Sequence, residues 1–231
     1  SDSPRPGRDA VPKALLPIGE RTPGSGEQTT FLRRQVELCY ALGVERVVVV
    51  VGYLREQIEA AVASWSRQPE IVVNTTPDIG VSGSLHSFQF AVRAGLGVLS
   101  GSHQTLLMDA DIVYHRKVLA TLLDAPESST ILISPTTVDD QEEVLVWGEL
   151  AAPRFLGKGL TSALTGGLGL LGEATGIVKI APGDHALARQ AMDWMLGDPD
   201  AEEGTLPFKG FGPAKRATEH EELTQRLMLL G

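Results

Sequence analysis

The chain has 231 residues, of which 42% are hydrophobic and 21% are charged, and its formal net charge is −9. This makeup predicts a globular protein with a full core, and it excludes a general nucleic-acid binder, because contact with the phosphate backbone needs a surplus of Lys and Arg. The longest apolar run, residues 47–51, is far shorter than the roughly 18 residues that a membrane span needs, so we expect a cytoplasmic protein without a membrane partner.

The first clear element is a helix over residues 30–42. It places Leu32, Val36 and Cys39 on one face behind a Thr cap, and Gly43 ends it. Because Cys39 is the single cysteine of the chain and lies on the apolar face, we expect a packed core thiol rather than a disulfide or a cysteine metal cluster.

Strand and helix patterns then alternate. Residues 45–53, ERVVVVVGY, are the continuous β-branched run of a strand that is covered on both faces. We expect further helices at 55–65, at 82–95 behind a Ser cap, and at 116–124, and further strands at 70–74 and 105–108. This alternation predicts an α/β fold with a mostly parallel sheet, because consecutive parallel strands are joined by right-handed helical crossovers.

From about residue 130 the pattern changes. Residues 130–135 and 143–150 predict strands, of antiparallel type, and helices at 185–196 and 219–230 complete the chain. The glycine-rich stretch 157–176 predicts a mobile loop or lid, with a solvent loop that has no role as the alternative.

Two carboxylates follow the expected strand at 105–108. Asp109 and Asp111 stand at its carboxyl end, which is where ligands of open α/β sheets bind. Mg²⁺ prefers hard oxygen ligands and is usually held by one or two carboxylates together with phosphates and water. The pair therefore predicts a metal site, against the alternative of a plain strand end. The second D-x-D copy, residues 198–200, has no strand before it, and we interpret it as a solvated turn.

Lys13 lies in the stretch VPKALLPIG (11–19), where a preceding proline and a following apolar run constrain the loop that presents its ammonium group. With the stretches that follow in order, the chain resembles the sugar-phosphate and choline-phosphate nucleotidyltransferases. The shared features are P-K-x-L-x-P-I, a helix beginning near L-x-R-Q, a β-run ending V-x-G-Y, an Asn after the next strand, a Ser-Leu helix start and a strand ending in D-A-D. The likeness covers about residues 11–123 and continues faintly through 155–180 towards the family's cytidylyltransferase branch.

The resemblance implies an α/β fold with a mostly parallel Rossmann-like sheet of the nucleotidyltransferase (GT-A-like) type and a smaller antiparallel acceptor-side region. It implies one domain over 1–231, with a nucleotide-binding half at 1–125 and an acceptor-binding half at 126–231. The implied activity is Mg²⁺-dependent transfer from an NTP, with CTP as first choice, to a small phosphorylated or phosphonate acceptor, with release of pyrophosphate. A homodimer is left open.

The resemblance also implies roles for particular residues. Lys13 would neutralise the α-phosphate of the nucleotide, and Asp111, with Asp109, would hold Mg²⁺ between the phosphates. Arg5 would stand in for an arginine of the family's phosphate-binding loop.

Further implied contacts lie later in the chain. Ser82, Gly83 and Ser84 would form a small-residue helix start that approaches the nucleotide with its backbone N–H groups. Lys158 and Glu173 would face the acceptor.

The chain departs from the family pattern at both ends. The family opens with a β-strand and a glycine-rich loop, A-A-G-x-G-S-R, whereas SDSPRPGRDA precedes residue 11 here. A missing central strand leaves buried backbone groups unpaired at about 1–3 kcal/mol each. We therefore expect the natural polypeptide to continue upstream, and the chain alone to lack most NTP affinity, with another segment or chain in the place of the strand as the alternative. In place of the family's W-x-E-I-D metal ligand the chain offers Glu219 and Glu221, with Thr218 capping an acidic helix start as the alternative.

Three other functions stay open. A GT-A-type glycosyltransferase also uses D-x-D to hold a metal on a nucleotide sugar, but it does not need the P-K loop. The molybdenum-cofactor guanylyltransferases share a Gly/Ser-rich helix start and differ in base preference. A non-catalytic nucleotide-binding partner would fit a chain without the phosphate loop.

Overall fold

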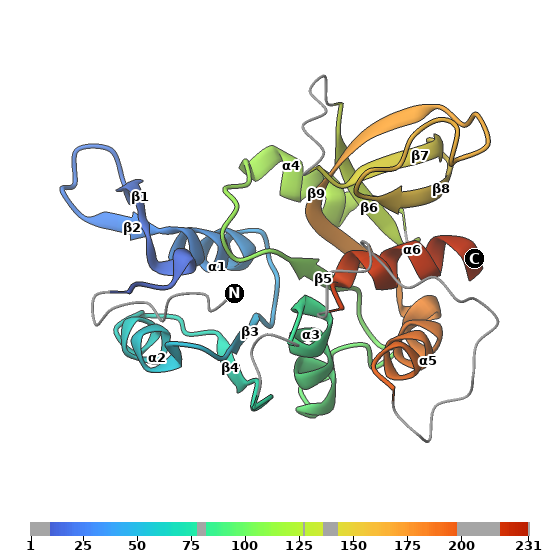
Figure 1. Ribbon diagram of the computed structural model, residues 1–231. Coiled ribbons are helices and arrows are strands. Elements are labelled where there is room, and N and C mark those ends of the chain that lie inside the picture. Colours follow the sequence, from blue (N-terminus) through green and yellow to red (C-terminus); the bar gives the residue numbers. More distant parts are fainter. Residues whose placement is uncertain (1–9, 78–81, 127, 136–142, 198–217, 231) are drawn as a thin grey trace. The chain divides into compact units, whose positions relative to one another are not determined.

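The computed structural model describes residues 10–77, 82–126, 128–135, 143–197 and 218–230 (Figure 1). Its contacts divide the chain into two compact units. The first unit comprises Ser1–Thr75 with Asp109–Thr121, and the second comprises Thr76–Met108 with Leu122–Gly231. Residues 76–108 and 122–125, which we expected in the nucleotide-binding half, belong to the same unit as the C-terminal part of the chain.

The first unit is built on a parallel strand pair. β3 (Val48–Val51) and β4 (Glu70–Val73) pair residue for residue. α1 (Phe31–Ala41) begins behind Thr30, whose hydroxyl accepts a hydrogen bond from a backbone N–H in the first helical turn, and Gly43, at φ 86°, follows its end. The predicted helix and strand are confirmed, and the Thr cap acts as expected.

α2 (Arg55–Ala63) completes the core of the first unit. The buried apolar side chains of this core are Leu32, Val36, Val51, Ile58, Val62 and Trp65. Cys39 is 6% exposed on the same face of α1, and burial raises the pKa of its thiol to about 11. The single cysteine is therefore the packed core thiol that the sequence predicted.

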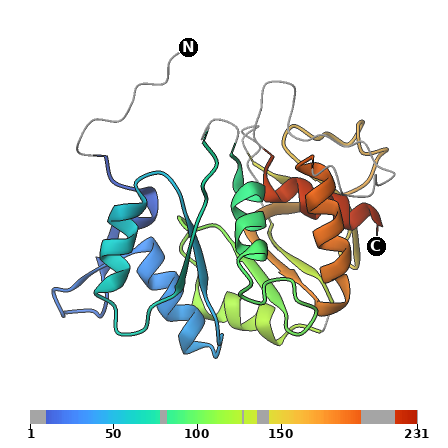
Figure 2. The same ribbon diagram turned by 90° about the horizontal axis from the view of Figure 1, so that it is seen from below.

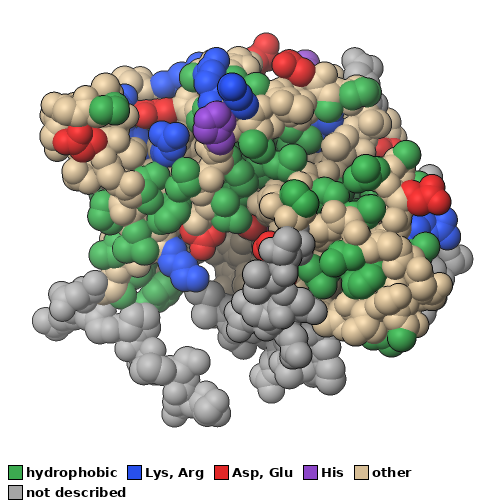
Figure 3. Space-filling view, turned by 90° about the horizontal axis from the view of Figure 1, so that it is seen from above, with side chains coloured by type: hydrophobic (Ala, Val, Ile, Leu, Met, Phe, Trp, Pro, Cys, Tyr) green, Lys and Arg blue, Asp and Glu red, His purple; other side chains and the backbone are tan. Residues whose placement is uncertain are grey.

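The first unit also contains a hairpin, which we did not predict. β1 (Pro17–Glu20) and β2 (Gln28–Thr30) pair antiparallel, and the Pro/Gly/Ser cluster at 23–26 between them is the turn signal that marks such a hairpin. Arg21 pairs with Glu37 of α1 at 2.7 Å. Figure 3 shows acidic and basic side chains close together over this hairpin, and exposed ion pairs of this kind contribute little to stability.

The second unit contains a five-stranded sheet around one long strand, β9 (Leu170–Ile180). β5 (Thr105–Met108) and β7 (Leu145–Glu149) pair with one edge of β9, and β6 (Thr130–Ser134) pairs with the other. β8 (Ala152–Gly157) pairs with β7. All of these pairings are antiparallel, so the parallel part of the described chain is smaller than the strand–helix alternation predicted. The reason is that β5 pairs with β9, which runs in the opposite direction.

The glycine-rich stretch 157–176 is only partly a loop. Residues 158–169 form the connection, but Leu170 to Gly176 belong to β9, so the expectation of a loop or lid over the whole stretch is wrong. At Gly172 (φ 151°) a Cβ would overlap the carbonyl oxygen of Ser134 on β6. This glycine therefore permits close approach of two strands rather than mobility.

Three helices pack together in the second unit. They are α3 (Ser84–Arg93), α5 (His185–Met195) and α6 (His220–Leu230). Figure 2 shows α3 and α5 side by side against the sheet. The buried residues that they share with the sheet and its connections are Leu85, Phe88, Leu99, Val178, Ile180, Ala188, Ala191, Met192 and Leu223.

Three elements remain: α4 (Arg116–Asp124), the 3₁₀ turn η1 (Lys13–Leu15) and the 3₁₀ turn η2 (Pro182–Asp184). Within the described ranges, none of the helices is both long and apolar enough to cross a bilayer.

The imidazole of His185 makes two hydrogen bonds inside the second unit. Its Nδ1 accepts from the backbone N–H of Gly101 at 2.8 Å, and its Nε2 lies 3.2 Å from the carbonyl oxygen of Ile180, so the neutral Nε2–H tautomer satisfies both partners. Burial lowers the pKa of His185. Because the folded-state pKa lies below the unfolded value of about 6.5, the stability that His185 contributes is present above that value and is lost as the pH falls through the folded-state pKa.

We expect the melting temperature to fall between about pH 7 and pH 5, by about 2–4 °C for each kcal/mol lost in a chain of this size. His185→Gln should reduce this dependence, because an amide accepts and donates at similar positions and does not titrate. Thermal unfolding of both proteins across this pH range is the measurement. An identical pH dependence of the melting temperature in the two proteins would show that the titration of His185 does not contribute to it.

Candidate functional site

The D-A-D segment forms a turn that directly follows β5. Asp109 is half-buried and Asp111 is exposed. Gln35 of α1, which is 7% exposed, anchors this turn. Its Nε2 donates to the carbonyl oxygen of Asp109 at 2.8 Å and to that of Ile112 at 2.6 Å. The backbone on both sides of Asp111 is thus fixed by one side chain.

The negative charge of this turn acts on the buried Tyr114. The phenol is 5% exposed, and burial together with the charges of Asp109 and Asp111 raises the pKa of Tyr114. Two carboxylates that act on one buried group concentrate negative charge, and carboxylate oxygens are the hard ligands that Mg²⁺ prefers. The donor set of the turn therefore fits a divalent cation of this kind.

Lys13 lies in the same unit and is presented by an anchored segment. Its side chain is exposed at the start of η1, while the following Ala14 and Leu15 pack against the core of the first unit. Upstream, Gln57 of α2 donates from Nε2 to the carbonyl oxygen of Ala10 at 3.0 Å. The constrained presentation that the sequence predicted for Lys13 is therefore present.

The start of α3 differs from the expected Ser cap. The helix begins at Ser84 with Gly83 at the cap position, and the cap residue makes no side-chain hydrogen bond. The first N–H groups are bonded to the C-terminal segment instead. The Ser84 N–H donates to Oε2 of Glu219 at 2.7 Å, and the Leu85 N–H donates to the carbonyl oxygen of Thr218 at 3.2 Å.

We call these contacts of Thr218, Glu219 and His220 with the start of α3 the C-terminal staple. The Ser84 hydroxyl donates to Oε2 of Glu219 at 2.7 Å and accepts from the His220 N–H at 2.8 Å. A carboxylate at a helix N-terminus is also stabilised by the helix dipole. Glu219 therefore caps α3. Glu219 is also the residue directly before α6, which is the position that the alternative of a Thr218 cap gives to Thr218.

Gly83 is required by this staple. An added Cβ would overlap the carbonyl oxygen of Thr218, and would lie 2.8 Å from the carbonyl carbon of Thr218 and 3.1 Å from Oε2 of Glu219. The space above Gly83 is filled by backbone, which cannot move aside as a flexible side chain does.

Of the two residues that we predicted to face the acceptor, Glu173 lies on the antiparallel sheet and Lys158 directly follows one of its strands. Glu173 of β9 is paired with Leu145 of β7, which is in turn paired with Gly157 of β8, directly before Lys158. Two strand spacings are about 10 Å. Lys158 and Glu173 are therefore near the same row of one sheet, with Lys158 exposed and Glu173 half-buried.

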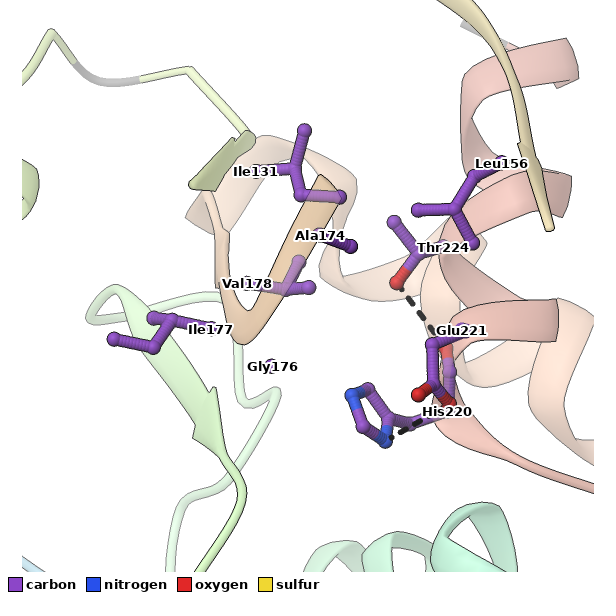
Figure 4. A pocket seen from close by; sticks show the side chains of 9 residues that line it. All are labelled: Ile131, Leu156, Ala174, Gly176, Ile177, Val178, His220, Glu221 and Thr224. Atoms are coloured by element: carbon purple, nitrogen blue, oxygen red, sulfur yellow. Dashed lines mark hydrogen bonds and ion pairs between the residues drawn. The ribbon is translucent and has the colours of Figure 1, made fainter. Parts of the chain in front are cut away.

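A small cavity lies between β9 and α6 (Figure 4). Its lining residues are Ile131, Leu156, Ala174, Gly176, Ile177, Val178, His220, Glu221 and Thr224. The Nδ1 of His220 lies 3.3 Å from Oε2 of Glu221. This lining, taken over the described residues, contains neither Lys nor Arg, so the cavity is not built to hold a phosphate group.

The predicted site residues divide between the units. The first unit holds Lys13, Asp109 and Asp111, and the second holds Ser82, Gly83, Ser84, Lys158 and Glu173. Arg5 and the second D-x-D copy lie outside the described residues.

Sequence reasoning missed Gln35 and the capping role of Glu219. The signal for Gln35 was a polar residue on the apolar face of α1, between Leu32 and Val36, and inside the L-x-R-Q pattern. No comparable signal marked Glu219, because its partner Ser84 is 135 residues away.

Comparison with solved structures places the fold among the nucleotidyltransferases. The inositol-1-phosphate CTP transferase from T. maritima superposes with a TM-score of 0.65 and 14% identity over 97% of this chain and 76% of that one. Apo-UDP-glucose pyrophosphorylase gives a TM-score of 0.62 and 14% identity over 95% of this chain and 80% of that one. The α/β nucleotidyltransferase-type fold is therefore confirmed.

The chain belongs to the MobA-like NTP transferase domain family, whose match spans residues 2–192. It is also 30% identical over 136 residues to the Bifunctional protein GlmU of Burkholderia mallei (strain SAVP1) and to that of Burkholderia pseudomallei (strain 668). Each alignment covers 58% of this chain and 26% of the relative, so the chain spans about a quarter of the length of these relatives.

Proposed function

We propose that this protein transfers a nucleotidyl group from an NTP, with CTP as first choice, to a small phosphorylated or phosphonate acceptor and releases pyrophosphate in a Mg²⁺-dependent reaction. The observation that carries the proposal is the presence, in the first unit, of an anchored lysine segment and a turn with two carboxylates. A nucleoside triphosphate needs a cation beside its phosphates and ligands for its metal, and this unit supplies both.

In the proposed reaction an oxygen of the acceptor's phosphate or phosphonate attacks the α-phosphorus in line. The bond from the α-phosphorus to the oxygen bridging to the β-phosphate breaks, and pyrophosphate carries that oxygen away. The Lys13 ammonium lies beside the α-phosphate and stabilises the charge that develops there. No covalent enzyme intermediate is needed, so catalysis consists of positioning and electrostatic stabilisation.

Asp111 and Asp109 are the proposed ligands of Mg²⁺. When bound, Mg²⁺ neutralises the negative charge of the phosphates. The hydrogen bonds from Gln35 to the flanking carbonyl groups support this role, because they fix the backbone that carries the carboxylates.

The remaining site residues are proposed from the sequence resemblance alone. Ser82 and Gly83 approach the nucleotide, whereas Ser84, whose N–H and hydroxyl are bonded to Glu219, holds this segment in place. Lys158 and Glu173 face the acceptor. Arg5 is proposed to contact the phosphates on sequence grounds alone.

The choice of CTP is supported by one structural neighbour, which is a CTP transferase, whereas another neighbour is a UDP-glucose pyrophosphorylase. The base therefore needs a direct test. The natural full-length protein is incubated with Mg²⁺, each of the four NTPs and a panel of phosphate and phosphonate acceptors, and pyrophosphate is measured. We expect pyrophosphate from CTP rather than from the other three NTPs, and only in the presence of an acceptor. Free nucleoside diphosphate from a nucleotide sugar, with no pyrophosphate from any NTP, would identify a glycosyltransferase instead.

Lys13→Ala is expected to lower kcat by about 10²–10³-fold, the usual effect of removing one group that stabilises transition-state charge. The side chain is exposed, so the melting temperature should not change. Lys117→Ala removes another exposed charge, from α4, and is the matched control. Equal turnover in the two variants would remove Lys13 from the proposed site.

A further inference from the structure

Gln35 is one of two buried glutamines in the described part of the chain, and it is 7% exposed on the apolar face of α1. Burying an amide costs free energy unless its polar atoms are bonded. Both hydrogen atoms of its Nε2 have acceptors, the carbonyl oxygens of Asp109 and Ile112. The orientation of the amide follows from this, because the flipped form would place Oε1 against two carbonyl oxygens.

The two carbonyl groups bracket the turn that contains Asp111. Holding both ends of the turn from α1 limits the backbone conformations that this turn adopts, whereas the Asp111 side chain itself is exposed and is not held by packing. Carbonyl groups bonded by a neutral amide are directed towards α1. The carboxylates, rather than these carbonyl groups, are therefore the oxygen donors of the turn that we take as the ligands of a cation.

We propose that Gln35 is a positioning residue for the divalent cation, and that its amide presets the Asp109–Asp111 turn in the geometry that binds the metal. This rests on the proposed function, because it takes these two carboxylates as the metal ligands. Residues that orient metal ligands through hydrogen bonds typically contribute about 10–100-fold to metal affinity or activity. Gln35 would contribute in this way without touching the metal or the nucleotide.

The test compares Gln35→Met with Gln225→Met. Methionine keeps the length of the side chain and removes both donors. Gln225 is the matched control, since it is 2% exposed and its Nε2 donates to the carbonyl oxygen of Arg154 at 3.0 Å, in the second unit. Both variants thus lose a buried amide that bonds backbone, but only one of them faces the D-A-D turn.

The first readout is the binding of Mn²⁺ alone, followed by electron paramagnetic resonance of the free ion. We expect Gln35→Met to raise the Mn²⁺ dissociation constant by about 10-fold or more, and Gln225→Met to stay within about twofold of the wild type. Hydrogen exchange of peptides that cover 109–113 should accelerate in Gln35→Met and not in Gln225→Met. If Gln35→Met does not fold, Gln35→Leu, which is also neutral and removes both donors, gives the same comparison.

The second readout is the Mg²⁺ dependence of pyrophosphate release. Gln35→Met should need about 10-fold more Mg²⁺ for half-maximal rate and should recover most of kcat at saturating metal. An unchanged Mn²⁺ dissociation constant in folded Gln35→Met, or an equal change in Gln225→Met, overturns the inference while the proposed function stands. If Asp111→Asn binds Mn²⁺ with the same dissociation constant as the wild type, both the metal assignment and the role of Gln35 are wrong.

Discussion

Asp111→Asn is expected to lower turnover by at least about 10²-fold with little change in stability. The substitution keeps the shape of the side chain and removes the negative charge that a hard cation needs. The size of the effect follows from the loss of one preorganised electrostatic contact to the transition state. Stability should hold because Asp111 is exposed and the bonds from Gln35 go to the backbone of its neighbours, which the substitution leaves intact.

The measurements are pyrophosphate release at saturating substrates and thermal unfolding. Asp198→Asn, in the second D-x-D copy, is the control for the motif and should behave as wild type. A large fall in melting temperature with turnover retained would make Asp111 a structural end to the strand rather than a metal ligand.

Gly83→Ala is the second large effect that we expect. The new methyl group would overlap the carbonyl oxygen of Thr218, so either α3 or the segment before α6 has to move. Forcing atoms into a packed site costs about 1–3 kcal/mol. The backbone of Gly83 has φ −87°, which any residue adopts, so the expected loss comes from the overlap and not from backbone strain.

Gly183→Ala is the matched control for this substitution, because a Cβ at Gly183 meets nothing within 4 Å. Chemical denaturation should give a lower unfolding free energy for Gly83→Ala and a value near wild type for Gly183→Ala. Hydrogen exchange in α6 should also accelerate in Gly83→Ala, since the staple is its link to the start of α3. Equal unfolding free energies of the two variants would show that the C-terminal staple accommodates the methyl group without loss of stability.

Local patterns predicted the local elements well. The apolar face of α1 and the β-branched run of β3 each determine an element from neighbouring residues alone, and both formed as expected. The position of Asp109 directly after β5 followed from the same kind of signal, because a strand ends where its apolar run ends. These predictions needed no knowledge of what the elements pack against.

Contacts between distant residues account for what was missed. The hydrogen bond from Gln35 to Asp109 joins residues 74 positions apart, and the capping of Ser84 by Glu219 joins residues 135 positions apart. The glycines before Gly176 were interpreted as loop residues, although Gly172 is a strand residue that lets β6 approach. A glycine permits both mobility and close packing, and only the neighbouring strand distinguishes the two.

The most direct test of the account is the fate of the individual phosphates of the NTP. The natural full-length protein is given its preferred acceptor and its preferred NTP, labelled with radioactive phosphorus at the α position in one reaction and at the γ position in the other. We expect the α label to enter the acceptor product and the γ label to be released as pyrophosphate. Transfer of the γ label to the acceptor, or its release as orthophosphate with the α label left in nucleoside diphosphate, would contradict it.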